Sequence, residues 1–164
     1  MKIHRLSFTL ISVLVAALAG AVWLGSAPAR AAFATMMSNI SPTVKGTVFG
    51  RPESVAFSGI VPIESKMVTD PDFGGGPNIV LSINLSGVSG TGLSTRTKYA
   101  TATQQVFIRP LAASDVVEFT FPFAPSGTSV TGVARDGLVT FKLTFDVATG
   151  RLTGAAGSIA TPAP

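Results

Sequence analysis

Residues 137–152 decide the fold class, and they read Gly-Leu-Val-Thr-Phe-Lys-Leu-Thr-Phe-Asp-Val-Ala-Thr-Gly-Arg-Leu. Apolar side chains occupy every second position from Val139 to Val147, and polar side chains stand between them. This alternation places an apolar set on one face of a β-strand and a polar set on the other. Residues 148–150 suit a hairpin loop, and a return strand begins at Leu152. Because one face of the strand is apolar, the pattern predicts a second layer that covers it.

The same alternation recurs along the chain between clusters of Gly, Pro, Ser and Asp. The further segments that read as strands are residues 43–49, 54–69, 78–86, 98–109, 116–123, 129–134 and 151–159. Short strands at near-regular spacing predict a single antiparallel β-sandwich or a small β-barrel of about eight strands over residues 43–160. The sandwich is slightly favoured, because residues 87–97 are long enough to cross between two sheets. Residues 35–42 are expected to be a flexible lead-in, and residues 161–164 a flexible tail.

Two features limit what this β domain is expected to do. Pro62, Gly154 and Gly157 interrupt the strand pattern, and such breaks protect edge strands from pairing with other chains. We therefore do not favour a polymerising subunit. A barrel that spans a membrane is also disfavoured, because such barrels carry aromatic girdles and Tyr99 is the only Tyr or Trp after residue 34.

The first 31 residues have the organisation of a secretory signal peptide. Lys2 and Arg5 open the chain, residues 6–24 carry no charged side chain, and small residues follow. The small-x-small rule fits a cut after Ala31 or after Ala34. An uncleaved membrane anchor is the alternative, since the apolar run approaches the thickness of a bilayer. Cleavage is favoured, and it predicts a periplasmic or extracellular protein with no membrane span after the signal is removed.

Charge and length then describe the exported part. Removal of the signal takes away three of the twelve Lys and Arg and leaves nine against eight carboxylates. The nine cations are scattered without a basic run, so nucleic acid is not expected as a partner. About 130 residues form one domain that is large enough to bury a core without disulfides.

The residues that common catalytic sites need are missing. His4, the only histidine, lies in the predicted signal, and the chain has no cysteine. This excludes Ser-His-Asp and Cys-His catalysis, zinc sites built on His or Cys, and thiol redox chemistry. We therefore expect a protein that is not an enzyme and has no cofactor. A carboxylate-dependent hydrolase that uses Asp70, Asp72 or Glu64 is a less favoured alternative.

Asp70 and Asp72 also form the sharpest local candidate for a metal site. They lie one residue apart beside the glycines at residues 74–76, and their oxygens could bind calcium. The other acidic ligands of a calcium loop are absent, so a proline-fixed turn in which Asp caps its own backbone is favoured.

A concentration of aromatic residues gives the candidate ligand site. Its members are Phe119, Phe121, Phe123, Phe141, Phe145 and Tyr99. Such residues are more often simply core, and a pure core is favoured here over a ligand pocket. The leading hypothesis is an exported, non-enzymatic β domain that acts as a binding, surface or structural module. The alternative is a carrier of a small apolar ligand in a barrel or sandwich cavity, so the partner is an unknown protein or a small apolar molecule.

Overall fold

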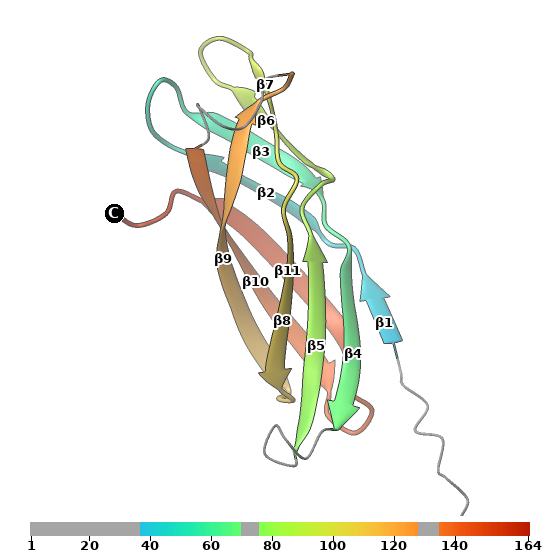
Figure 1. The fold of residues 1–164 in the computed structure, drawn as a ribbon. Coiled ribbons are helices and arrows are strands. Elements are labelled where there is room, and N and C mark those ends of the chain that lie inside the picture. Colours follow the sequence, from blue (N-terminus) through green and yellow to red (C-terminus); the bar gives the residue numbers. More distant parts are fainter. Residues whose placement is uncertain (1–36, 70–75, 128–134) are drawn as a thin grey trace, which may run out of the picture. The chain divides into compact units, whose positions relative to one another are not determined.

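The computed structural model describes residues 37–69, 76–127 and 135–164, which form β-strands and the turns between them (Figure 1). The strands are β1 (Met37–Ile40), β2 (Thr43–Val48), β3 (Val55–Ile60), β4 (Ile63–Thr69), β5 (Pro77–Asn84), β6 (Val88–Gly92), β7 (Lys98–Ala100), β8 (Gln104–Pro110), β9 (Ser114–Pro125), β10 (Arg135–Asp146) and β11 (Arg151–Ala160). The prediction of an all-β fold is confirmed. The predicted signal, Asp70, Asp72 and the strand expected at residues 129–134 lie outside the described residues.

No helix among the described residues is long and apolar enough to cross a lipid bilayer.

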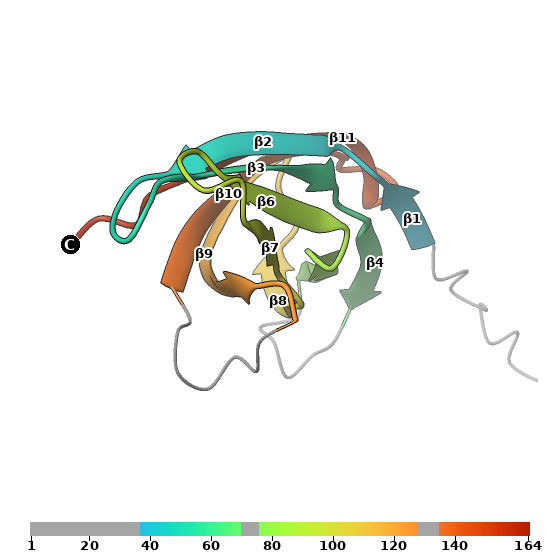
Figure 2. The same cartoon turned by 90° about the horizontal axis from the view of Figure 1, so that it is seen from above.

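The strands form a closed barrel and an open sheet. Seven strands follow one another in the barrel in the order β10-β11-β2-β3-β6-β7-β9, and pairing of β9 with β10 closes it (Figure 2). All neighbours in the barrel are antiparallel except β11 and β2, which run parallel. The open sheet is antiparallel with the order β1-β4-β5-β8. The barrel alternative is therefore confirmed and the slight preference for a sandwich is not, because closure depends on a pairing between the two ends of the domain.

The chain passes repeatedly between the barrel and the open sheet. Residues 54–69 are two strands, with β3 in the barrel and β4 in the sheet, and residues 98–109 are likewise divided into β7 and β8. The bends lie side by side, since the amide of Asn84 donates to the carbonyl of Pro62 (3.1 Å) and the amide of Leu85 to that of Thr103 (2.8 Å). These two divisions, together with β1 and β6, add four strands to the eight expected, and eleven are described because the strand expected at residues 129–134 lies outside the described residues.

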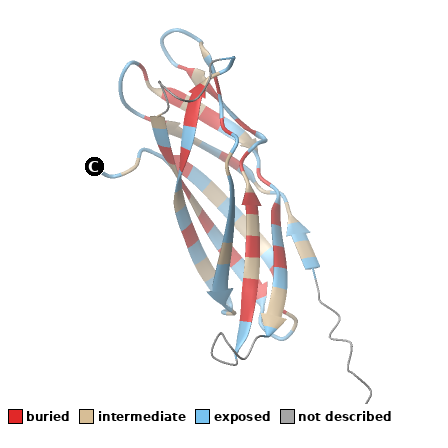
Figure 3. Ribbon diagram, viewed as in Figure 1, coloured by how far each residue is buried: buried red, intermediate tan, exposed pale blue. Residues whose placement is uncertain are grey.

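Residues 137–146 of the alternating stretch belong to β10, and residues 147–152 form the hairpin loop and the start of β11. Val139, Phe141 and Leu143 are at most 1 % exposed, and the residues between them are more exposed, as the banded colouring of the strands in Figure 3 shows. β10 pairs with β9 on one side and with β11 on the other. Gly150 has a φ of 68°, which is the positive value expected in the hairpin loop.

Large rings fill the barrel by lying over glycines on the neighbouring strand. The pairs in direct register are Phe57 with Gly90, Phe121 with Gly137 and Phe141 with Gly157. A β-carbon placed on any of these glycines would lie 2.5–2.7 Å from an atom of the facing ring. All three rings are at most 2 % exposed. The glycines are therefore positions where the barrel has room for a ring and for nothing more.

This packing changes the role of the glycines that were expected to protect an edge. Gly154 and Gly157 lie on β11, which has a neighbour on both sides in the barrel. Gly157 makes room for Phe141 and Val44, whereas a β-carbon on Gly154 would meet only the side chain of Thr144 on the exposed face.

These two glycines predict different costs for the same substitution. Gly157→Ala is expected to lower the free energy of unfolding by roughly 1–3 kcal/mol, because the added methyl group overpacks the barrel against Phe141. Gly154→Ala is the matched control in the same strand and is expected to change it by less than about 0.5 kcal/mol. Chemical denaturation of both variants measures the difference, and equal costs would contradict this account of the core.

Candidate functional site

The aromatic residues singled out in the sequence lie together, and most of them fill the domain interior. Tyr99, Phe123, Phe57 and Phe121 make successive ring contacts with centroids 4.9–5.8 Å apart. Phe119 lies between Phe107 (5.5 Å) and Phe141 (6.4 Å). Phe121 and Phe141 have no exposed surface, and Phe145 is 8 % exposed at the end of β10. Of the predicted set, Phe123 is the member that reaches the pocket described next.

The candidate ligand site is a pocket of about 300 Å³ at the point where β7 meets the end of β9. Ala100, the last residue of β7, and residues 101–103, which connect β7 to β8, line one side of it, and residues 122–127 line the other. The lining includes the ring of Phe123, two prolines and three alanines, so it is mainly apolar. We call it the β7–β9 pocket. Its volume falls at the small end of the range for small-molecule sites.

One polar group in the wall of the β7–β9 pocket is unsatisfied. Thr101 is 6 % exposed, and its hydroxyl oxygen is buried without a hydrogen-bond partner among the described residues. A buried hydroxyl that lacks a partner costs roughly 1–3 kcal/mol. Native proteins leave few such groups, and each one calls for an explanation, such as strain, a functional role, or a bound water or ion. An unmatched hydroxyl therefore lies buried in the wall of a mainly apolar pocket.

A buried carboxylate supports the pocket from behind. Glu53, just before β3, accepts hydrogen bonds from the amides of Ser94 (3.0 Å) and Thr95 (2.9 Å) and from the Thr95 hydroxyl (2.6 Å). The Tyr99 hydroxyl donates to the same carboxylate (3.1 Å). We call these four residues the Glu53 cluster. It ties the β6–β7 turn to the start of β3 and fixes Tyr99 beside the pocket wall.

Arg135 joins the Glu53 cluster to the pocket wall. Its guanidinium donates to the backbone carbonyl of Glu53 (2.7 Å) and lies 5.2 Å from the centre of the Phe123 ring. A cation over an aromatic face is stabilising. Phe123 is therefore held between Arg135, Tyr99 and Phe57, which gives the β7–β9 pocket a rigid wall.

The protonation states of the cluster follow from these contacts. The hydrogen bonds from Thr95, foremost the one from its hydroxyl, lower the pKa of Glu53 to about 2 despite its burial. Burial, and next the hydrogen bond to Glu53, raise the pKa of Tyr99. At neutral pH the carboxylate is charged and the phenol is neutral, as an anchoring contact requires.

The Glu53 cluster cannot be recognised in the sequence, because Glu53 is one carboxylate among eight. Gly92 is the one residue whose type could have pointed to this cluster. A β-carbon on Gly92 would overlap the Glu53 carboxylate, so the glycine of the facing strand leaves the space that the carboxylate fills. Thr101 was likewise missed, since an isolated threonine between two alanines has no distinctive pattern.

The carboxylates that the sequence raised as metal ligands or catalytic groups are not brought together in the described residues. Asp70 and Asp72 lie outside them, and Glu64 is exposed on β4. Residues 37–69, 76–127 and 135–164 contain no group of three His, Cys, Asp or Glu that could hold a metal ion.

Comparison of the chain with protein-family models, with curated proteins and with solved structures gave no match.

The Glu53 cluster predicts how stability depends on pH. A carboxyl group whose pKa is lower in the folded than in the unfolded chain stabilises the fold above its ordinary pKa of 4.5, and that stability is lost as the pH falls towards about 2. Glu53→Gln is therefore expected to lower the free energy of unfolding at neutral pH and to flatten its decline between pH 4.5 and 2. Glu64→Gln, at an exposed position, is the control and should leave both unchanged. Denaturation curves measured at several pH values test this, and an unaltered pH profile in Glu53→Gln would contradict it.

Proposed function

We propose that this protein is a non-enzymatic binding protein that takes up a small, mainly apolar molecule in the β7–β9 pocket. The observation that carries the proposal is the buried hydroxyl of Thr101, which lines an apolar pocket and has no hydrogen-bond partner among the described residues. A ligand with an apolar body and one hydrogen-bonding group would satisfy this hydroxyl, after a small rotation of the side chain, while its body covers the ring of Phe123.

The packing of the barrel supports this location over the barrel interior. Phe57, Phe121 and Phe141 lie against glycines and fill the space between the strands. A ligand placed among them would have to displace a ring, and each buried ring contributes roughly 1.5–3 kcal/mol. The β7–β9 pocket needs no such rearrangement, because its wall is already fixed by the Glu53 cluster.

The N-terminal sequence supports a periplasmic or extracellular setting for this binding. A role as a surface or structural module, which the sequence also allows, stays a prediction.

Titration with N-phenyl-1-naphthylamine tests the proposal directly. This probe is apolar, carries one N–H group and fluoresces strongly in apolar surroundings. Protein exported and purified from its own host is expected to bind one probe per chain with saturable fluorescence enhancement. Native mass spectrometry of the same sample would also detect a small molecule retained from the host. A probe signal that rises without saturation would overturn the proposal.

A pair of variants distinguishes probe binding in the β7–β9 pocket from probe binding to other apolar surfaces. Ala102→Phe places a ring at the pocket lining and is expected to weaken probe binding about tenfold or more. Ala112→Phe adds the same ring at an exposed position in the β8–β9 turn and should leave binding unchanged. Equal binding by both variants would exclude this pocket as the site.

Removal of the Thr101 hydroxyl is expected to raise the stability of the fold and to weaken probe binding. Thr101→Val keeps the shape of the side chain and removes the unsatisfied oxygen, so the free energy of unfolding is expected to rise by about 1 kcal/mol. The same variant should bind N-phenyl-1-naphthylamine more weakly, because the N–H group of the probe loses its acceptor. Denaturation and fluorescence titration measure the two effects. A loss of stability would show that the hydroxyl is bonded in the free protein.

A further inference from the structure

Strand β8 ends the open sheet with an unpaired edge. It pairs with β5 along its whole length, and no described strand pairs with its other side (Figure 1). The neighbouring β8–β9 turn carries the chain into the barrel, where β9 pairs with β10 and β7 instead.

The hydrogen bonds between β5 and β8 show which backbone groups of β8 point away from the sheet. The amide of Leu85 donates to the carbonyl of Thr103 (2.8 Å), and the amide of Leu111 donates to that of Pro77 (3.0 Å), in register with the β5–β8 ladder. Antiparallel bonding alternates along a strand, so every second residue between Thr103 and Leu111 bonds to β5. The residues in between, notably Val106 and Ile108, direct their N–H and C=O groups away from the sheet.

The side chains on this edge are apolar as well. Val106 is 59 % exposed and Ile108 is 51 % exposed on the outer face of the sheet. Natural edge strands are usually protected by lysines, prolines or bulges, and β8 has a regular register with proline at its last residue alone.

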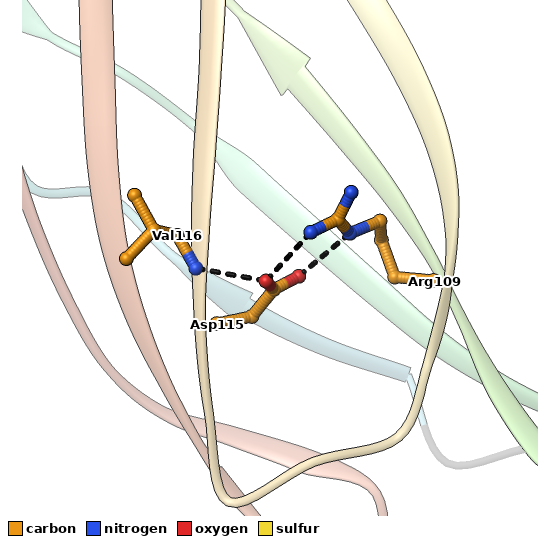
Figure 4. Close-up of polar contacts among 3 residues, drawn as sticks. All are labelled: Arg109, Asp115 and Val116. Carbon is orange, nitrogen blue, oxygen red and sulfur yellow. Dashed lines mark hydrogen bonds and ion pairs between the residues drawn. The ribbon is translucent and has the colours of Figure 1, made fainter.

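The single charge on β8 is already compensated. Arg109 makes two hydrogen bonds of 2.9 Å to the carboxylate of Asp115, which also accepts from the amide of Val116 (2.8 Å) (Figure 4). The hydrogen bond from Arg109 lowers the pKa of Asp115, so this pair stays charged and mutually neutralised at neutral pH. The edge therefore presents backbone groups and apolar side chains without net charge.

We propose that two copies of this chain pair antiparallel through β8, about a two-fold axis at Phe107. This register sets Val106 opposite Ile108 of the partner subunit, and these two residues exchange their outward N–H and C=O groups. The amide of Gln104 meets the carbonyl of Pro110 of the partner subunit, where the missing N–H of proline is no obstacle. Arg109 faces Gln105 of the partner subunit, so no like charges meet. The two open sheets become one continuous sheet.

The sequence of β8 favours a second copy as the occupant of this edge. Val106 and Ile108 flank Phe107 symmetrically, so the strand is complementary to itself in the antiparallel direction. Registers centred on Val106 or Ile108 place one of these side chains opposite Gln104 or Pro110 and lose an apolar pair.

Sedimentation equilibrium on the exported protein, from micromolar to millimolar concentration, tests the proposal. A reversible dimer is expected. Val106→Pro removes an N–H group that points away from β5, so it is expected to raise the dimer dissociation constant about tenfold or more and to leave the monomer fold intact. Val106→Lys blocks the same edge by charge and decides the outcome if the proline variant does not fold. Val147→Lys, at a similarly exposed valine in the β10–β11 turn, is the control.

Hydrogen exchange identifies the strand in the same sample. The amides of Val106 and Ile108 are expected to become protected as concentration rises, whereas the amide of Phe107, bonded to β5, stays protected throughout. A monomer at all concentrations would overturn the proposal. So would a dimer that Val106→Lys leaves unchanged, because its interface would lie elsewhere.

Discussion

The barrel depends on one steric constraint, which is that three of the large rings inside it each face a glycine on the neighbouring strand. Phe57, Phe121 and Phe141 come from three different strands, and each lies over a glycine in direct register on the strand beside it. The register of the strands and the volume of the core are therefore fixed by the same contacts. A slip of one residue in any of these pairings would bring a side chain under the ring and turn the apolar set outward.

The rings that fill the interior leave the end of the barrel as the place for the binding that we propose. The β7–β9 pocket lies where the chain leaves the barrel for the open sheet. The ring of Phe123 in its wall is held by Tyr99 of the Glu53 cluster and by Arg135, which is bonded to the backbone of Glu53. In the proposed binding, the charged carboxylate would act as a positioning group at a distance from the ligand. Because the hydrogen bonds of the Glu53 cluster hold this apolar wall in place, we expect the wall to have the same shape with and without a ligand.

The fold class could be predicted from sequence because alternation is a local property of each strand, as in residues 139–147. The bends could not be predicted, since Val61 and Ile63 continue the alternation through the passage from barrel to sheet and the pattern does not change there. Residues 87–97, expected only to cross between two sheets, contain β6, in which Gly90 and Gly92 are strand residues that lie against Phe57 and Glu53. The aromatic residues could be singled out from the sequence, but the β7–β9 pocket could not. Thr101 and Glu53 acquire their roles only from residues distant in the chain.

Tyr99 is the only tyrosine in the chain, and the only tryptophan, Trp23, lies in the segment predicted to be removed on export. The near-ultraviolet absorption and emission of residues 35–164 thus arise mainly from one phenol, which is bonded to an ionised carboxylate and in contact with the ring of Phe123. A carboxylate that accepts a proton from an excited phenol quenches its emission. The fluorescence intensity of Tyr99 consequently reports whether its hydrogen bond to Glu53 is intact, without any added label.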